Sequence, residues 1–289
     1  AFYGEALVRD MTAYYGVARE GSRTSAADYL AFCDRHDLPY EEAWPEPDQL
    51  RRDRVDICLR VPEPVFDFWD LKALVEKRLL ASPAITLRLG HEVVGGALRA
   101  GGTKRLDVRH AGVTTPVDVD VLINAAFYDI NTACAWFDFP RRAFQYDTKE
   151  LAIIRLPTTT RLAITVMDGP FCTFLPMGRS GKFLLGHVRE SVLSRDIGRD
   201  TPTRERPPSR WTAIRDASAE FFPFVRQAEF LESMFTRIVV DPDSAADDAR
   251  VSEITAHGRG CWTVFSAKIV SCVTVADALA GEIARYLGD

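Results

Sequence analysis

The clearest candidate for chemistry in this 289-residue chain is Lys268, near the C-terminus. An apolar strand predicted for residues 262–266 runs through the turn Ser266, Ala267 and Lys268 into an amphipathic helix predicted for 269–287. The N-terminus of a helix offers free N–H donors and the positive end of a dipole, which suits an anionic group. A lysine at that end opposes the dipole. This favours a functional role over the alternative, a solvated residue at an ordinary helix start.

Guanidinium groups are the next candidates, because they can donate two parallel hydrogen bonds to a substrate carboxylate. Arg250 is the best of these, and a surface ion pair with Asp247 or Asp248 is the alternative. Arg155 lies in the apolar run 151–156 and needs an anionic partner if it faces inward, whereas it is unremarkable if it faces solvent. Three further residues could line a substrate pocket, although such residues are more often structural: Tyr146, His187 and His257.

A short run, residues 121–126, is apolar apart from Asn124 and has the pattern of a strand that is buried on both faces. It ends in Asn124, Ala125 and Ala126. Ligands of open α/β sheets gather beyond the carboxyl ends of strands, and small residues there permit close approach. Ordinary packing explains the two alanines equally well. Val93 belongs to another predicted strand and has no chemistry of its own.

The elements that must position these residues indicate a mixed α/β (α+β) fold. Residues 84–135 and 233–289 have the pattern of α/β layers. Residues 1–83 and 136–232 contain helices and four strands between 150 and 188 that predict an antiparallel meander. Residues 1–11 have the pattern of the second half of a helix, so we expect a natural beginning upstream. Gly-Gly turns are predicted at Gly95 and Gly101. Four residues predict an apolar stripe that packs the last helix: Val273, Ala276, Leu279 and Ala280.

Composition excludes several classes of protein. The formal net charge of −5 argues against a nucleic-acid partner, and no apolar run reaches the roughly 18 residues that span a membrane. Six cysteines lie far apart without CxxC spacing, so we expect no metal site and a reducing, cytoplasmic setting. The pattern suits a small-molecule substrate, and a homo-oligomer is compatible with it.

Three segments resemble the flavin-dependent oxidoreductases of the D-amino-acid oxidase family: LLASPAITLRLGHEVVG, VLINAAF and DDARVSEITAHGRGCWTVFSAKIVSCVTVADALA. The resemblance implies an FAD/NAD(P)-binding, Rossmann-like domain in 84–135 and 233–289, interleaved with an antiparallel substrate domain in 1–83 and 136–232. It implies oxidation of a small amine, amino acid or hydroxy acid by hydride transfer to the flavin of FAD. The positions that it assigns to the cofactor are Val93, Asn124, Ala125, Ala126, Ser266, Ala267, Lys268 and Ile269.

The sequence departs from the family at several points. It contains no GxGxxG phosphate-binding loop, so we expect that some tens of residues precede Ala1 or that the cofactor site has been lost. Ala267 and Phe127 stand where the family has glycine, and Val251 stands where it has proline. The alternative function is therefore a cofactor-free relative that serves as a binding or scaffold protein.

Overall fold

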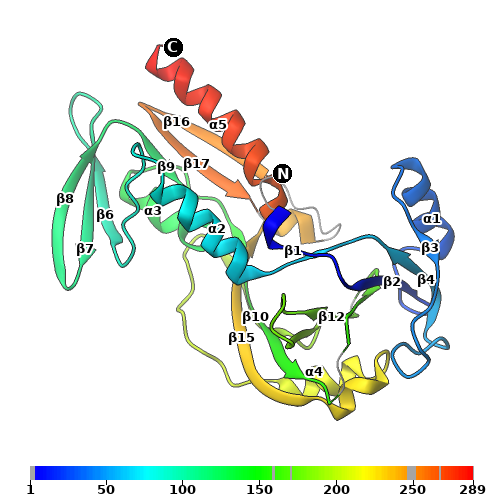
Figure 1. The fold of residues 1–289 in the computed structure, drawn as a ribbon. Helices are drawn as coiled ribbons and strands as arrows, with labels where there is room; N and C mark the ends of the chain where they lie inside the picture. Colours follow the sequence, from blue (N-terminus) through cyan, green and yellow to red (C-terminus); the bar gives the residue numbers. More distant parts are fainter. Residues whose placement is uncertain (1–3, 158–159, 170, 246–251, 267, 289) are drawn as a thin grey trace. The chain divides into compact units, whose positions relative to one another are not determined.

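The computed structural model describes residues 4–157, 160–169, 171–245, 252–266 and 268–288 (Figure 1). The chain divides into two compact units. Unit 1 comprises residues 1–86, 149–193 and 206–236, and unit 2 comprises 87–148, 194–205 and 237–289. Unit 2 thus takes in 136–148 and 194–205, which the sequence analysis grouped with the substrate domain. The roles assigned to the two domains stay predictions.

Unit 1 is built on a sheet in the order β10–β13–β12–β11–β2–β4–β3. Its strands are β2 (Thr12–Ala18), β3 (Glu41–Glu42), β4 (Val55–Val61), β10 (Phe144–Arg155), β11 (Leu162–Met167), β12 (Cys172–Pro176) and β13 (Phe183–His187). Strands β14 (Val192–Gly198) and β15 (Glu229–Val240) both pair with β10. The other elements are α1 (Ala26–Arg35), α2 (Phe68–Leu80), α4 (Trp211–Ser218) and η3 (Pro223–Gln227).

The predicted meander is correct only for β11, β12 and β13. Strand β10 pairs with β13, and β11 pairs in parallel with β2, where Leu162 lies opposite Thr12. Most residues of β2 and β11 are buried or half-buried. Such burial is typical of parallel neighbours, which are covered on both faces. A local pattern cannot predict this pairing, because it joins segments about 150 residues apart in the sequence.

The helix predicted across residues 1–11 is wrong for the described part of that segment. It forms the 3-10 turn η1 (Gly4–Ala6) and strand β1 (Leu7–Val8), which pairs with β5 (Val65–Phe66). Helix α2 begins at Phe68, because Asp67 is its N-cap and accepts hydrogen bonds from two backbone N–H groups of the first turn.

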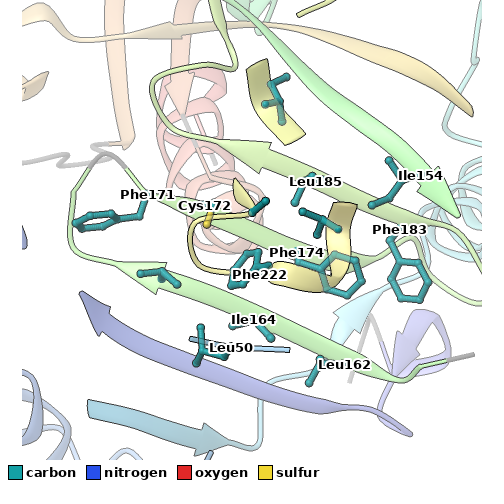
Figure 2. Close-up of a cluster of buried hydrophobic side chains, with 14 of the residues drawn as sticks. Leu50, Ile154, Leu162, Ile164, Phe171, Cys172, Phe174, Phe183, Leu185 and Phe222 are labelled. Carbon is teal, nitrogen blue, oxygen red and sulfur yellow. The ribbon is translucent and has the colours of Figure 1, made fainter. Parts of the chain in front are cut away.

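The core of unit 1 lies between the sheet, α4 and η3 (Figure 2). Phe174 is fully buried, with its ring stacked on Phe183 at 4.7 Å and edge-on to Phe224 at 4.9 Å. Burial of one such ring stabilises the fold by about 1.5–3 kcal/mol. Leu50, Ile164 and several other buried apolar side chains extend the cluster. The aromatic and aliphatic runs of β11–β13 are therefore explained by packing alone.

Unit 2 contains two small sheets. One has the order β16–β17–β9, with β17 parallel to β9, and the other has the order β6–β7–β8. The bounds are β6 (Glu92–Leu98), β7 (Lys104–His110), β8 (Val113–Val119), β9 (Leu122–Asn124), β16 (Ser252–Gly258) and β17 (Cys261–Ser266). The remaining elements are η2 (Phe127–Asp129), α3 (Ile130–Trp136), η4 (Pro242–Ala245), η5 (Ile269–Ser271) and α5 (Cys272–Leu287).

Two expectations about unit 2 are wrong. Strand β6 continues through Gly95, where its register shifts, and only the turn at Gly101 and Gly102 exists. A side chain at Gly96 would overlap the ring of Phe137, so close packing explains that glycine. The apolar stripe of α5 is largely exposed, since Leu279 is the one buried residue among the described residues of this helix.

The described residues also bear on membrane spans, metal sites and disulfides. None of the described helices is long and apolar enough to cross a membrane. The described His, Cys, Asp and Glu side chains form no group of three that could hold a metal ion. All six cysteines are free thiols, and Cys272 alone among them is exposed.

Candidate functional site

A cavity of about 1160 Å³ opens in unit 2 between β6, β7, β9 and α3. We call it the cleft. Four of the residues assigned to the cofactor line it: Val93, Asn124, Ala125 and Ala126. Its other walls are mostly apolar and include Leu106, Leu122, Ile123, Ala133, Trp136, Phe137 and Phe139. The carboxyl end of β9 therefore does meet a cavity, as the position of ligands in α/β sheets predicts.

Asn124 is buried and shapes the wall of the cleft. Its Nδ2 donates to the carbonyl oxygen of Ile130 at 2.9 Å and contacts Cys134 Sγ at 3.5 Å. Its Oδ1 accepts from the N–H of Ala126 at 3.2 Å. The amide thus ties the bend after β9 to the first residue of α3. This structural role is additional to the ligand contact predicted from the sequence.

Charged residues flank the cleft in two pairs. Arg109 Nη2 on β7 donates to Glu92 Oε2 on β6 at 2.6 Å, and the two residues are cross-strand neighbours. Arg204 Nη2, in the segment after β14, donates to Asp129 Oδ2. Sequence reasoning missed both arginines. The pairing of β6 with β7 could have indicated Arg109, whereas no local pattern indicates Arg204.

A second cavity, of about 440 Å³, lies between β9, β17 and the start of α5. Three more of the assigned residues line it: Ser266, Lys268 and Ile269. Ala125 and Ile123 line both this cavity and the cleft, so the two cavities share a wall at the end of β9. Ala267 lies outside the described residues.

The N-terminus of α5 is open towards this cavity. Its N-cap, Ser271, makes no side-chain capping hydrogen bond, because the hydroxyl donates to the carbonyl oxygen of Lys268 at 2.8 Å. The Ser266 hydroxyl lies 2.8 Å from that of Ser271. Lys268 is exposed. The N–H of Ser271 bonds the Lys268 carbonyl oxygen and that of Cys272 bonds the Ile269 carbonyl oxygen, so the 3-10 turn η5 satisfies part of the helix start. The exposed Lys268 ammonium and the positive end of the helix dipole face this cavity and suit an anionic group.

Phe127 follows the Ala125–Ala126 bend with a φ of 48°, a backbone conformation that bulky residues rarely adopt. Such a conformation costs on the order of 1–3 kcal/mol. Its ring lines the second cavity and lies near-parallel to Phe265, with 6.4 Å between the ring centroids. A glycine at this position would relieve the strain and enlarge the cavity.

The residues predicted to bind substrate are not gathered at one place in the described chain. Arg250 lies outside the described residues. Arg155 has an exposed side chain and pairs with Glu229 at 2.8 Å. Tyr146 is buried, and its hydroxyl accepts a hydrogen bond from Asn131. Arg155 and Tyr146 line neither the cleft nor the second cavity.

The two histidines of this set are held differently. His187 is buried in unit 1, where its Nδ1 accepts from the backbone N–H of Glu190, and burial lowers the pKa of its imidazole. His257 lines a cavity of about 170 Å³ in unit 2 and bonds Thr263 Oγ1 through Nε2 at 2.8 Å. Its ring stacks on Phe139, a wall of the cleft, at 4.1 Å. Among the residues predicted to bind substrate, His257 is thus the one whose ring packs against a residue that lines the cleft.

No family model matches the sequence, and no curated protein matches it. Solved structures do match in fold. A crystal structure of glycine oxidase from Geobacillus kaustophilus has a TM-score of 0.72 at 15% identity, covering 97% of this chain and 72% of that one. A crystal structure of L-proline dehydrogenase from P. horikoshii has a TM-score of 0.70 at 12% identity, covering 99% of this chain and 74% of that one. A structure of dithionite-reduced L-α-glycerophosphate oxidase from Mycoplasma pneumoniae, with FAD bound, has a TM-score of 0.65 at 15% identity. It covers 96% of this chain and 73% of that one. The chain therefore shares the fold of these proteins, as the resemblance in its sequence predicts.

Proposed function

We propose that this protein is an FAD-dependent oxidoreductase that oxidises a small amine, amino acid or hydroxy acid. FAD would accept a hydride from a substrate C–H bond, and the protein supplies position and electrostatics. The observation that carries the proposal is the pair of cavities that share Ala125 as a wall residue, each lined by residues that the resemblance assigns to FAD. The shared fold supports it, because one of the similar structures has FAD bound.

The cleft suits the adenosine half of the cofactor. Its volume of about 1160 Å³ is slightly larger than that of typical ligand pockets, which have ~300–1,000 Å³. The aromatic rings of Trp136 and Phe139 and the aliphatic side chain of Val93 offer apolar surface to a base. Ala125 and Ala126 have no side chain beyond Cβ, so a ligand can approach the backbone there. Unit 2 is accordingly the proposed cofactor unit, and unit 1 the proposed substrate unit.

The second cavity suits the flavin half. Flavin gains negative charge when it accepts a hydride, and the open N-terminus of α5 would stabilise that charge by about 0.3–1 kcal/mol, and more if partly buried. The Lys268 ammonium would add to this effect. The same end of the helix would do little for a neutral ligand. A negatively charged flavin would offset the unfavourable interaction between the Lys268 ammonium and the positive end of the helix dipole.

Substrate binding remains assigned as the sequence predicts, to Arg250, Arg155, Tyr146, His187 and His257. We expect Arg250→Ala to weaken the binding of a carboxylate-bearing substrate. An unchanged KM and rate would remove Arg250 from the set.

A second candidate function is a binding or scaffold protein without flavin chemistry. One specific observation favours it: the Phe127 ring occupies part of the second cavity from a strained backbone position. A cavity narrowed in this way would exclude the flavin ring and still accept a smaller ligand.

The two candidates differ in a visible spectrum. The purified full chain, alone and after addition of FAD, should show the absorption bands of a bound flavin. Anaerobic addition of glycine, L-proline or glycerol phosphate in turn should bleach them with one substrate class. A colourless protein that retains no added FAD would refute the proposal in favour of the binding protein. A bound flavin that none of these compounds reduces would leave FAD in place and exclude these three compounds as substrates.

A further inference from the structure

We propose that Arg109 and Arg204 bind the phosphate groups of a nucleotide in the cleft of unit 2. The inference rests on the proposed function in one respect, that the nucleotide is part of FAD. It adds what neither the sequence nor the fold assigns, namely the residues that recognise the phosphates.

The two arginines reach one cavity from separate elements. Arg109 lies on β7, and Arg204 lies in the segment between β14 and α4. Among the described residues that line the cleft, they are the only lysines or arginines. The walls around them are largely apolar.

Each guanidinium has hydrogen-bonding capacity beyond its carboxylate partner. Arg109 reaches Glu92 through Nη2, and Arg204 reaches Asp129 through Nη2. A guanidinium carries five N–H donors in a planar fork, so each can hold its carboxylate and a phosphate oxygen together. Both ion pairs are well exposed, with 50% and 54% of the two arginine side chains accessible. Exposed pairs of this kind are weak, so a ligand can redirect the arginines.

The chemistry of the cleft favours a phosphorylated ligand with an aromatic base over a small carboxylate. A cavity of about 1160 Å³ is far too large for a small carboxylate alone, and its aromatic walls suit a base. Guanidinium groups donate paired hydrogen bonds to phosphate oxygens, and Arg109 and Arg204 carry the only such groups among the described residues that line the cleft.

Glu92 and Asp129 limit the strength of the effect. They neutralise the two arginines, so the cleft has no net positive field from these four residues. Phosphate would then be held by directed hydrogen bonds, and long-range attraction would be small. We expect a moderate preference for phosphorylated ligands that depends on the fork geometry of arginine.

The test measures the affinity of the full chain for ADP and for adenosine by isothermal titration calorimetry. The wild type should bind ADP more tightly than adenosine. Arg109→Gln and Arg204→Gln should each lower the affinity for ADP by about tenfold, as expected for loss of a charge-assisted hydrogen bond, and leave the affinity for adenosine unchanged. Arg204→Lys should behave as Arg204→Gln does, because a lysine keeps the charge and loses the fork.

Arg105→Gln is the matched control. Arg105 also lies on β7 and pairs with Asp107 at 3.3 Å, with 38% of its side chain accessible, but it does not line the cleft. Its substitution should change neither affinity. Circular dichroism of every variant checks that unit 2 remains folded.

Equal affinities of the wild type for ADP and adenosine would overturn the inference, and so would ADP binding that both glutamine variants retain. The failure of the proposed function has a different signature. FAD binding with unchanged arginine variants would overturn the phosphate inference alone. ADP binding that depends on the arginines, without FAD binding, would overturn the flavin function alone.

Discussion

Replacement of Asn124 by alanine tests how the end of β9 is held. The side chain is 8% exposed and joins the Ala125–Ala126 bend to the start of α3. Asn124→Ala removes the 2.9 Å bond to the Ile130 carbonyl and the 3.2 Å bond from the Ala126 N–H. It also removes the weak contact with Cys134 Sγ.

The expected loss of stability follows from the surroundings of the two bonds. Ile130 is 2% exposed, so its carbonyl loses a partner that water does not readily replace, at a cost of about 1–3 kcal/mol. Ala126 is exposed, so its N–H can bond water, and the second bond contributes about 0.5–1.5 kcal/mol. The free energy of unfolding should fall by roughly 2–4 kcal/mol. The bend should also loosen, which lowers the affinity of the cleft for nucleotide.

Urea denaturation followed by circular dichroism measures the first effect, and titration with ADP measures the second. Asp67→Ala is the matched control, because this buried carboxylate in unit 1 accepts three backbone N–H bonds, from Trp69, Asp70 and Arg179. Its loss should cost a similar free energy of unfolding and leave the affinity for ADP unchanged. A loss below about 0.5 kcal/mol for Asn124→Ala would refute the structural role given to this amide. Equal loss of nucleotide affinity in both variants would refute its specific link to the cleft.

Three further substitutions probe other parts of the two units. Gly96→Ala should push the Phe137 ring towards the cleft, lowering stability by about 1–3 kcal/mol and nucleotide affinity with it, as thermal denaturation and calorimetry would measure. Burial lowers the pKa of the His187 imidazole, so the unfolded chain binds the proton more tightly than the folded chain does. The free energy of unfolding should therefore fall as the pH drops below about 6.5, and it should fall less in His187→Gln. Urea denaturation at several pH values measures both. Arg195→Ala leaves the buried Asp147 carboxylate without its bidentate partner and should cost about 1–3 kcal/mol in the same assay, since the guanidinium is half exposed.

Each of these has a clear contrary result. Gly96→Ala with wild-type stability would mean that the Phe137 ring yields without cost. Parallel pH profiles of wild type and His187→Gln would assign the acid loss of stability to other groups. Arg195→Ala as stable as the wild type would show that the carboxylate of Asp147 does not need the guanidinium.

Local patterns predicted the parts of the site that one short segment builds. The continuous apolar run before Asn124 predicts a buried strand that ends at the cleft, and the strand–turn–helix pattern predicts β17, Lys268 and α5. Each depends on residues close in the sequence, where periodicity and turn chemistry act. The mixed α/β fold follows from the order of such segments and is confirmed.

The remainder depends on contacts between distant segments. Arg204 joins Asp129 across 75 residues, and β2 joins β11 across about 150. The Gly95-Gly96 pair has the composition of a turn, yet both residues belong to a strand because they pair with β7. Gly96 also leaves room for the Phe137 ring, which a side chain at this position would overlap. Val273 belongs to an apolar stripe that predicts burial, but it is 49% exposed. A sequence pattern gives the apolar face of a helix without showing whether another element covers it.

The central claim is that FAD lies across the end of β9, and a titration with FAD tests it most directly. Flavin fluorescence would be followed for the wild type and for Ala125→Phe, which places a ring at a position that lines both cavities. Ala125 is exposed, so this substitution is compatible with folding. Ala100→Phe, at an exposed position of the β6–β7 turn, is the matched control. The account predicts saturable binding to the wild type and to Ala100→Phe, with affinity at least about tenfold lower for Ala125→Phe. Equal affinity of all three chains for FAD, or no binding to the wild type, would contradict it.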